Sequence, residues 1–245
     1  MTAIVIIPAR YQSARFPGKL LCPLKGKPII QHVYENAKKA ILPDDVIIAT
    51  DSETVFEKVS VFGGKAAMTD KKHPSGTDRI AEVAASLDCD IIVNVQGDEP
   101  LIRPEMIDEV ISLLDDTRAS MGTLAKKIRE AQEIMDPNVV KVVFTSEGFA
   151  LYFSRSPIPF LASHSEHKAA YSCYKHIGIY SYRRDALLTL TRMSPSCLEQ
   201  TEKLEQLRAL EHGMRIRVKE TFFETHGVDT PQDLERVEQW LNTSL

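Results

Sequence analysis

A cationic segment near the N-terminus could bind a polyphosphate. Arg10, Arg15 and Lys19 lie close together, directly after the apolar run at residues 4–7. Arginine offers phosphate oxygens two donors in one plane, and lysine offers a point charge. The chain as a whole has a formal net charge of -4 at pH 7, so these cations stand out from their background. A buried strand followed by such a loop predicts a phosphate-binding site.

Asp98 follows a second apolar run, residues 91–95, within the sequence Gln96-Gly97-Asp98. Gly97 lets the backbone turn and approach a ligand closely. Carboxylate oxygens are ligands that Mg²⁺ prefers, with waters and substrate phosphates completing its shell. The alternative is a turn aspartate that caps nearby backbone. Beside a cationic phosphate loop, we favour the metal.

Asp229 lies just before a predicted helix start. Thr230 suits the N-cap, Pro231 suits the first helical position and Asp233 completes a capping box. The helix alone explains these three residues. Asp229 is left over and can point back at the sheet, so we predict a second metal ligand there.

Residues 73–79 open another predicted helix. Ser75 or Thr77 would serve as its N-cap, with Asp78 complementing the helix dipole. The functional interpretation is that free N–H groups and hydroxyls in this segment read the edge of a nucleobase.

Four residues in the second half are weaker candidates on spacing alone. Arg155 and His176 could each be structural, and a lone arginine is usually a solvated charge. Glu205 and Gln206 fall off the leucine stripe of their predicted helix, so a solvated helix face is the alternative for both.

The elements that must position these residues follow a βαβα rhythm in the first half. We expect strands at 4–7, 46–49 and 91–95, and helices at 28–40, 52–62, 76–87 and 104–114. This pattern predicts an α/β fold, a Rossmann-like three-layer domain with a mostly parallel central sheet. Ligands of such sheets bind at the carboxyl ends of the strands, where the segments 8–19 and 96–100 would lie.

Strands predominate after about residue 120. We expect strands at 121–125, 139–145, 150–154, 176–182 and 216–220, helices at 198–212 and 230–241, and an irregular loop at 156–172. No linker is visible, so residues 1–245 form one domain. Residues of about 126–195 would be a smaller inserted lobe for substrate binding, and its exposed strands would offer an edge for a homodimer.

Composition excludes several classes of protein. The 245 residues are 43% hydrophobic, enough for one large core, and a pI of about 6.0 argues against bulk attraction to nucleic acid. No apolar run approaches the roughly 18 residues that span a bilayer, and no signal peptide is recognisable, so we expect a cytoplasmic protein without membrane insertion. Cys22, Cys89, Cys173 and Cys197 are scattered and are expected to be reduced thiols.

Seven segments, in this order along nearly the whole chain, carry a family resemblance. They are Ile-Pro-Ala-Arg10 through Arg15-Phe-Pro-Gly-Lys19, His73-Pro-Ser-Gly-Thr, Val-Gln96-Gly-Asp98-Glu-Pro, Leu151-Tyr-Phe-Ser-Arg155, His176-Ile-Gly-Ile-Tyr, Leu204-Glu-Gln-Leu-Arg208 and Gly227-Val-Asp-Thr-Pro. Together they resemble the 3-deoxy-manno-octulosonate (Kdo) cytidylyltransferases of the sugar-nucleotidyltransferase superfamily. The superfamily's glycine-rich first loop is replaced here by Ala9-Arg10, as in the Kdo branch, and residues 161–172 match no motif.

The resemblance implies that CMP passes from CTP to the anomeric hydroxyl of Kdo, with release of pyrophosphate and with Mg²⁺ as cofactor, as a step of lipopolysaccharide synthesis. It assigns the nucleotide to Arg10, Arg15, Lys19, Ser75, Arg79 and Gln96. It assigns the sugar acid to Gln96, Arg155, His176, Glu205 and Gln206. It assigns magnesium to Asp98 and Asp229, and catalysis to these two residues with Arg10 and Lys19.

Three alternatives stay open on the sequence. A sialic-acid cytidylyltransferase activates a similar sugar acid, but would need different residues around 155 and 176. A glycosyltransferase typically has Asp-x-Asp after a strand, where this chain has Gln-Gly-Asp-Glu. A non-catalytic nucleotide-binding regulator would keep the phosphate loop but would not need both aspartates.

Overall fold

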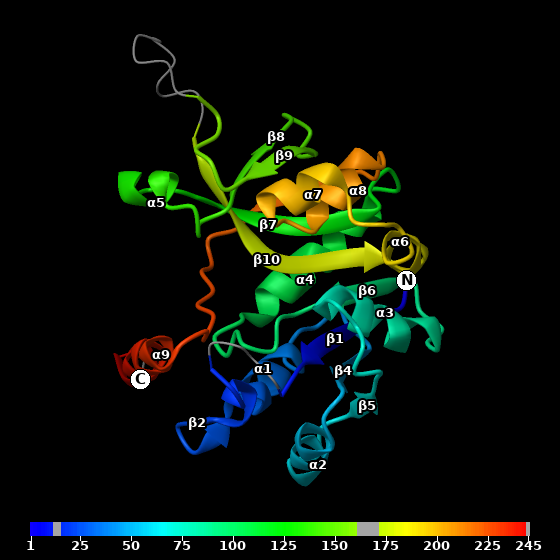
Figure 1. Cartoon of the computed structure of the whole chain (residues 1–245), viewed down its shortest axis with the longest axis vertical. Coiled ribbons are helices and arrows are strands. Elements are labelled where there is room, and N and C mark those ends of the chain that lie inside the picture. Colours follow the sequence, from blue (N-terminus) through cyan, green and yellow to red (C-terminus); the bar gives the residue numbers. More distant parts are fainter. Residues whose placement is uncertain (12–15, 161–171, 244–245) are drawn as a thin grey trace.

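In the computed structural model, which describes residues 1–11, 16–160 and 172–243, helices cover both faces of one central sheet (Figure 1). The strands are β1 (Ala3–Ala9), β2 (Pro23–Leu24), β3 (Lys27–Pro28), β4 (Asp45–Thr50), β5 (Ala66–Met68), β6 (Ile91–Asn94), β7 (Met121–Lys127), β8 (Lys141–Phe144), β9 (Ala150–Ser154), β10 (Tyr174–Arg183) and β11 (Ile216–Glu220). The α-helices are α1 (Ile29–Ala37), α2 (Glu53–Val61), α3 (Gly76–Ala85), α4 (Pro104–Ser112), α5 (Ala131–Met135), α6 (Arg184–Leu190), α7 (Cys197–Glu202), α8 (Gln206–Glu211) and α9 (Pro231–Thr243). Two short 3-10 helices are η1 (Lys19–Leu21) and η2 (Leu113–Asp115).

The strands of the central sheet follow the order β11-β7-β10-β6-β1-β4-β5. Only β10 runs antiparallel to its neighbours along this path, so the expectation of a mostly parallel sheet is confirmed. In the centre, β1 pairs with β6 and β4 in register. The carboxyl ends of β1 and β6 therefore meet at one edge of the sheet, and the segments after them lie side by side.

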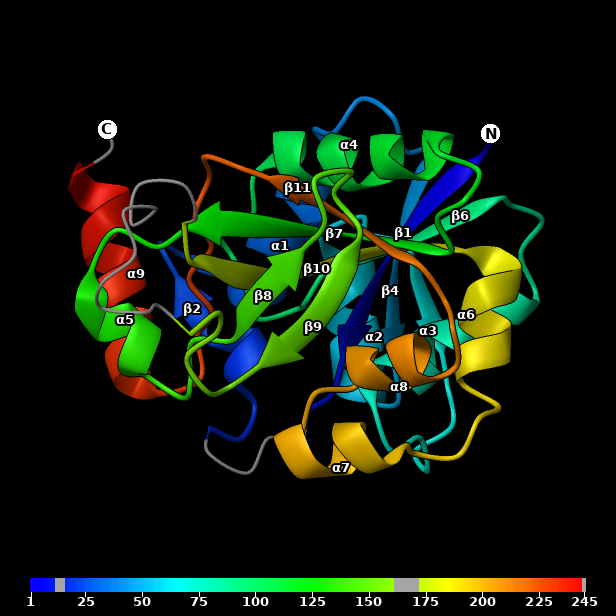
Figure 2. The ribbon, with the colours of Figure 1, turned by 90° about the horizontal axis from the view of Figure 1, so that it is seen from above.

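The two faces of the sheet bury separate apolar clusters. Alternate residues of β1 divide between them, since Val5 and Ile7 belong to one cluster and Ile6 to the other. Helices α1, α2 and α4 pack on the first face, and α3, α6 and α8 on the second. Figure 2 shows α4 and α8 on opposite sides of β7 and β10.

A third, smaller cluster attaches the C-terminal helix. Leu24 of β2 and Ile29, the first residue of α1, pack with two valines at the C-terminal helix. Val228 precedes α9 and Val237 lies within it. This contact holds the segment 227–230 near the end of β6, although the preceding strand β11 lies at the edge of the sheet. The fold thus brings Asp229 to the same edge as Asp98.

The segment 126–195 is divided between two parts of the structure. Strands β8 and β9 pair with each other and leave the path of the central sheet at β10. Strand β10 itself lies inside the central sheet between β7 and β6. The four cysteines, all among the described residues, form no disulfide. No helix in the described ranges is long and apolar enough to cross a membrane.

Most predicted elements lie within a few residues of their observed bounds, but the single helix predicted at 198–212 is wrong. The chain forms two helices there, because Lys203 adopts a left-handed conformation with φ 56° and ends α7. Leu204 then turns into the core, and α8 begins at Gln206. Four further features were not predicted: the β2–β3 hairpin, β5, α5 and α6.

Candidate active site

Three charged side chains converge at the carboxyl edge of the sheet. The Lys19 Nζ lies 2.5 Å from Asp98 Oδ2 and 2.9 Å from Asp229 Oδ1. The Lys19 side chain is only 10% exposed, against 29% for Asp98 and 45% for Asp229. The ammonium is therefore held inside the protein, while both carboxylates keep a solvent-accessible side.

The local sequence explains how the two aspartates reach this point. A Cβ atom at Gly97 would lie 2.8 Å from the Pro8 carbonyl oxygen, so glycine lets the turn after β6 pack against the end of β1. The Val228 N–H donates to the Asp98 carbonyl at 2.8 Å and ties the two segments together. Thr230 and Asp233 form the expected capping box of α9. Thr230 and Asp233 thus cap the helix, and Asp229 Oδ1 accepts from Lys19 Nζ.

Lys19 is placed by the turn before it. Gly18 has φ 71°, in the left-handed region, and precedes the short helix η1. Burial alone would lower the pKa of Lys19, but the charges and hydrogen bonds of Asp98 and Asp229 outweigh it and raise the pKa above its usual value. Lys19 therefore remains a cation at neutral pH.

A cavity of about 350 Å³ opens beside this cluster. Arg10 lies on its wall, where its Nη2 donates to the His73 carbonyl at 2.6 Å. Ser75 is the N-cap of α3 and accepts from the Asp78 N–H at 3.0 Å. The lining residues are Pro8, Arg10, Lys19, Leu20, Pro74, Ser75, Gly76, Gln96, Gly97 and Asp98. The structure thus brings together the predicted nucleotide residues Arg10, Lys19, Ser75 and Gln96.

A second cavity, of about 230 Å³, shares Gly76 and Gln96 with the first. Its lining residues are Gly76, Thr77, Asn94, Gln96, Met121, Tyr180, Tyr182, Leu190, Glu205 and Gln206. Burial raises the pKa of Glu205, and hydrogen bonds from the Thr77 and Ser75 hydroxyls and the charge of Arg208 partly oppose this rise. Gln206 is only 7% exposed, so the solvated-face alternative for Glu205 and Gln206 is wrong.

His176 faces a third cavity, of about 350 Å³, whose lining includes Glu99 and Gly227. Burial lowers the pKa of His176 to about 3, so its ring is neutral. The Thr123 Oγ1 lies 3.0 Å from His176 Nε2 and 2.7 Å from the Ile179 carbonyl oxygen. Because the single hydroxyl proton is given to that carbonyl, Nε2 carries the ring proton and donates to Oγ1. Burial and the neighbouring Asp98 charge raise the pKa of Glu99 to about 8.

The structure places two predicted arginines away from these cavities. Arg155 donates from Nε to the Glu202 carbonyl at 2.8 Å and from Nη1 to the Pro137 carbonyl at 3.0 Å, so it covers the C-terminus of α7. Arg79 is fully buried, and its Nη2 lies 2.7 Å from Asp51 Oδ2. Its partner Asp51 lines a further cavity together with Arg10, so Arg79 supports the wall of that cavity. Arg15 lies outside the described residues.

The two aspartates fit a hard cation. Their oxygens approach one shared ammonium, so a single positive charge already lies between them. Within residues 1–11, 16–160 and 172–243, no group of three or more His, Cys, Asp or Glu side chains could hold a metal ion. Two carboxylates that leave room for waters and phosphates match what Mg²⁺ usually takes from a protein.

Several lining residues escaped the sequence analysis. Tyr180 and Tyr182 reach the second cavity after a register shift in the pairing of β10 with β7, between Ile177 and Tyr180. A shift that depends on long-range pairing gives no local signal. Asn94 did give one, since it is a polar residue at the end of an apolar strand.

Known proteins resemble this chain over most of its length. A family model described as cytidylyltransferase matches residues 4–216. The 3-deoxy-manno-octulosonate cytidylyltransferase of Geobacter metallireducens is 56% identical over 250 residues, covering 99% of this chain and 98% of the relative. That of Pelobacter propionicus is 57% identical over 242 residues, covering 96% and 95%. A solved structure of a CMP:2-keto-3-deoxy-manno-octonic acid synthetase complexed with CTP superposes with a TM-score of 0.94 at 44% identity, covering 100% of both chains.

Proposed function

Because the chain belongs to the cytidylyltransferase family, together with full-length relatives that are 3-deoxy-manno-octulosonate cytidylyltransferases, we propose that it transfers CMP from CTP to Kdo. The observation that carries the proposal is the convergence of Lys19, Asp98 and Asp229 beside two cavities that share Gln96. The cavity with Arg10 and Lys19 suits a nucleoside triphosphate. The adjoining cavity suits a polyhydroxylated sugar acid.

The reaction needs alignment and charge neutralisation more than a protein nucleophile. The anomeric oxygen of Kdo attacks the α-phosphorus of CTP, the bond to the bridging oxygen breaks, and pyrophosphate leaves with that oxygen. The cationic Lys19, held at the edge of the nucleotide cavity, would balance charge that develops on the α-phosphate. Arg10 would contact phosphate oxygens by its guanidinium.

Asp98 and Asp229 would hold Mg²⁺. When bound, the ion lowers the pKa of a coordinated hydroxyl and neutralises phosphate charge. The two carboxylates would then be shared between the ion and Lys19, which lies at the edge of the nucleotide cavity.

Glu205, Gln206 and Gln96 would orient the sugar acid by hydrogen bonds to its hydroxyls. A carboxylate at the buried Glu205 position accepts from hydroxyl groups, whereas the Gln206 amide can both donate and accept. His176 would contribute as a neutral group. Arg155 would act beside the α7–α8 junction, where its guanidinium contacts backbone carbonyls.

Assembly and location belong to the same proposal. Leu151 on β9 and Phe160 just after it are 61% and 91% exposed, which supports a homodimer formed through the β8–β9 region. The substrates are small molecules, and we propose that the enzyme works in the cytoplasm without nucleic-acid partners. Sedimentation at micromolar concentration tests the dimer, and a monomer would contradict it.

The test of the function is pyrophosphate release from CTP with Kdo or N-acetylneuraminate as acceptor. We expect release with Kdo, little release with N-acetylneuraminate, and none without an acceptor. A preference for N-acetylneuraminate would show that the acceptor is a sialic acid and not Kdo. CTP binding without release in the presence of any sugar acid would instead indicate a regulator.

A further inference from the structure

The junction between α7 and α8 presents two of the residues that line the second cavity, Glu205 and Gln206. It contains a strained residue, because Lys203 has φ 56° and ψ 45°. Residues other than glycine adopt that conformation only at an energetic cost. Strain of this kind persists only where surrounding contacts determine the backbone. Those contacts therefore decide where Glu205 and Gln206 lie.

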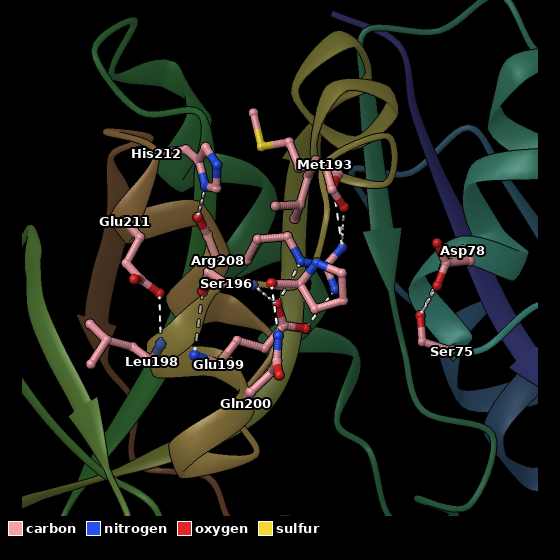
Figure 3. Close-up of polar contacts among 12 residues, drawn as sticks. Ser75, Asp78, Met193, Ser196, Leu198, Glu199, Gln200, Arg208, Glu211 and His212 are labelled. Carbon is pink, nitrogen blue, oxygen red and sulfur yellow. Dashed lines mark hydrogen bonds and ion pairs between the residues drawn. The ribbon is translucent and has the colours of Figure 1, made fainter.

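The strongest contact across the junction is a two-pronged ion pair (Figure 3). The Arg208 Nε donates to Glu199 Oε2 at 2.7 Å, and Arg208 Nη2 donates to Glu199 Oε1 at 2.5 Å. The two side chains are 9% and 13% exposed. Parallel hydrogen bonds between planar groups fix orientation as well as distance, and partial burial protects them from solvent screening.

Both residues of this ion pair also make hydrogen bonds to other parts of the structure. Glu199 also completes the capping box of α7, since its Oε2 accepts from the Ser196 N–H at 3.0 Å. Arg208 Nη1 donates to the carbonyl of Leu190, the last residue of α6, at 3.3 Å. Leu190 itself lines the second cavity. One guanidinium thus joins α6, α7 and α8 at the wall of that cavity.

Arg208 also acts on the cavity by its charge. It lies three residues after Glu205, on the same helical turn, and its charge opposes the rise in the pKa of Glu205 caused by burial. The charge of Asp78, at the start of α3, also favours the cationic form of Arg208 and raises its pKa. Figure 3 shows the Ser75–Asp78 pair facing the α7–α8 unit.

From this geometry we infer that Arg208 is a positioning residue for the acceptor substrate. Its planar contact with Glu199 fixes the α7–α8 junction, so that Glu205 and Gln206 project into the cavity next to Gln96. The inference rests on the proposed function, since it assigns this cavity to a sugar acid. It predicts that Arg208 controls recognition of the acceptor and leaves the nucleotide cavity unaffected.

The test variant is Arg208→Lys, which removes the planar guanidinium but keeps the positive charge. Lysine retains a cation near Glu205 but cannot make two parallel hydrogen bonds to Glu199. The matched control is Arg183→Lys, because Arg183 donates to the Ala119 and Leu114 carbonyls at 2.8 Å and lines none of the cavities described above. Both variants lose a multi-bond arginine contact that joins separate elements.

We expect Arg208→Lys to raise the KM for Kdo at least tenfold while the KM for CTP stays within twofold, and to speed amide hydrogen exchange at residues 204–206. Arg183→Lys should change neither KM. Unchanged Kdo KM in Arg208→Lys, or an equal rise of both constants, overturns the inference. If Arg208→Lys does not fold, Glu199→Gln weakens the same contact from the other side, and an unchanged Kdo KM there also overturns it. Failure of the wild-type protein to use Kdo refutes the proposed function instead, so the two failures are distinguishable.

Discussion

Replacing Asp98 by asparagine separates the catalytic role of this residue from its structural role. The asparagine keeps the shape of the side chain and removes its charge. In the folded protein, Lys19 would lose its 2.5 Å partner but keep Asp229 at 2.9 Å. The stability cost is therefore that of one hydrogen bond between charged groups, about 2 kcal/mol, and not that of an unpaired buried charge. For a chain of this length, we expect Tm to fall by about 4–8 °C.

The loss of activity should be much larger. Asp98 is one of only two carboxylates proposed to hold Mg²⁺, and removing its charge should cost several kcal/mol of transition-state stabilisation. A loss of about 4 kcal/mol lowers the turnover rate about 1000-fold. The stability loss cannot produce this fall, because the variant remains folded at 25 °C.

The assay is pyrophosphate release at saturating CTP, Kdo and Mg²⁺, with Tm measured on the same samples. Asp233→Asn is the matched control, because the Asp233 carboxylate lines none of the cavities described above and accepts from the Thr230 N–H at 2.9 Å and the Asp229 N–H at 3.2 Å, and an asparagine oxygen can still accept from both. The control should lose stability and keep its turnover rate. Retention of more than about a tenth of wild-type turnover by Asp98→Asn would show that Asp98 is not a metal ligand.

Three further predictions follow from single contacts. Lys19→Ala should lower kcat more than it raises the KM for CTP in steady-state kinetics, because its charge is needed most in the transition state; an unchanged kcat would remove Lys19 from the mechanism. Arg155→Lys should raise the KM for Kdo and leave that for CTP nearly unchanged, since lysine cannot hold the Glu202 and Pro137 carbonyls together beside the α7–α8 junction; an effect on CTP alone would place Arg155 on the nucleotide. Burial alone would raise the pKa of Glu224, but hydrogen bonds from Lys175 and Lys126 outweigh this effect and lower the pKa from 4.5 to about 2. The ionised Glu224 therefore stabilises the fold above pH 4.5, and this stabilisation is lost as the pH falls toward 2. In denaturant titrations, Glu224→Gln should lower the free energy of unfolding by about 1 kcal/mol at pH 7, a figure discounted for solvent exposure, and should have no effect at pH 2. A difference that does not change with pH would contradict this.

The main features of the fold and of the charged cluster could be predicted from local sequence. Apolar runs with a strand period, separated by amphipathic helices, indicate a parallel sheet, and the carboxyl ends of such strands share one edge. That rule alone brings Lys19 and Asp98 together. The capping box explained Thr230 and Asp233, which left Asp229 as the residue without a helical role.

Long-range contacts decided the features that could not be predicted. Lysine has no preference for a left-handed turn, so its residue type does not indicate the break at Lys203, which the Arg208–Glu199 pair spans. A sequence likewise cannot show whether a guanidinium binds a ligand or backbone carbonyls, and Arg155 contacts carbonyls of Glu202 and Pro137. Arg79 is similar, because its partner Asp51 comes from a different segment of the sheet edge.

The most direct measurement of the central claim is phosphorus NMR of the purified protein with CTP, Kdo and Mg²⁺. We expect the triphosphate signals of CTP to be replaced, in equal amounts, by pyrophosphate and by one phosphodiester signal from the CMP–sugar acid product. Neither signal should form when Kdo is left out or when Asp98→Asn replaces the wild type. Pyrophosphate formed without Kdo, or CMP released without the phosphodiester, would contradict the claim that these two cavities transfer CMP to a sugar acid.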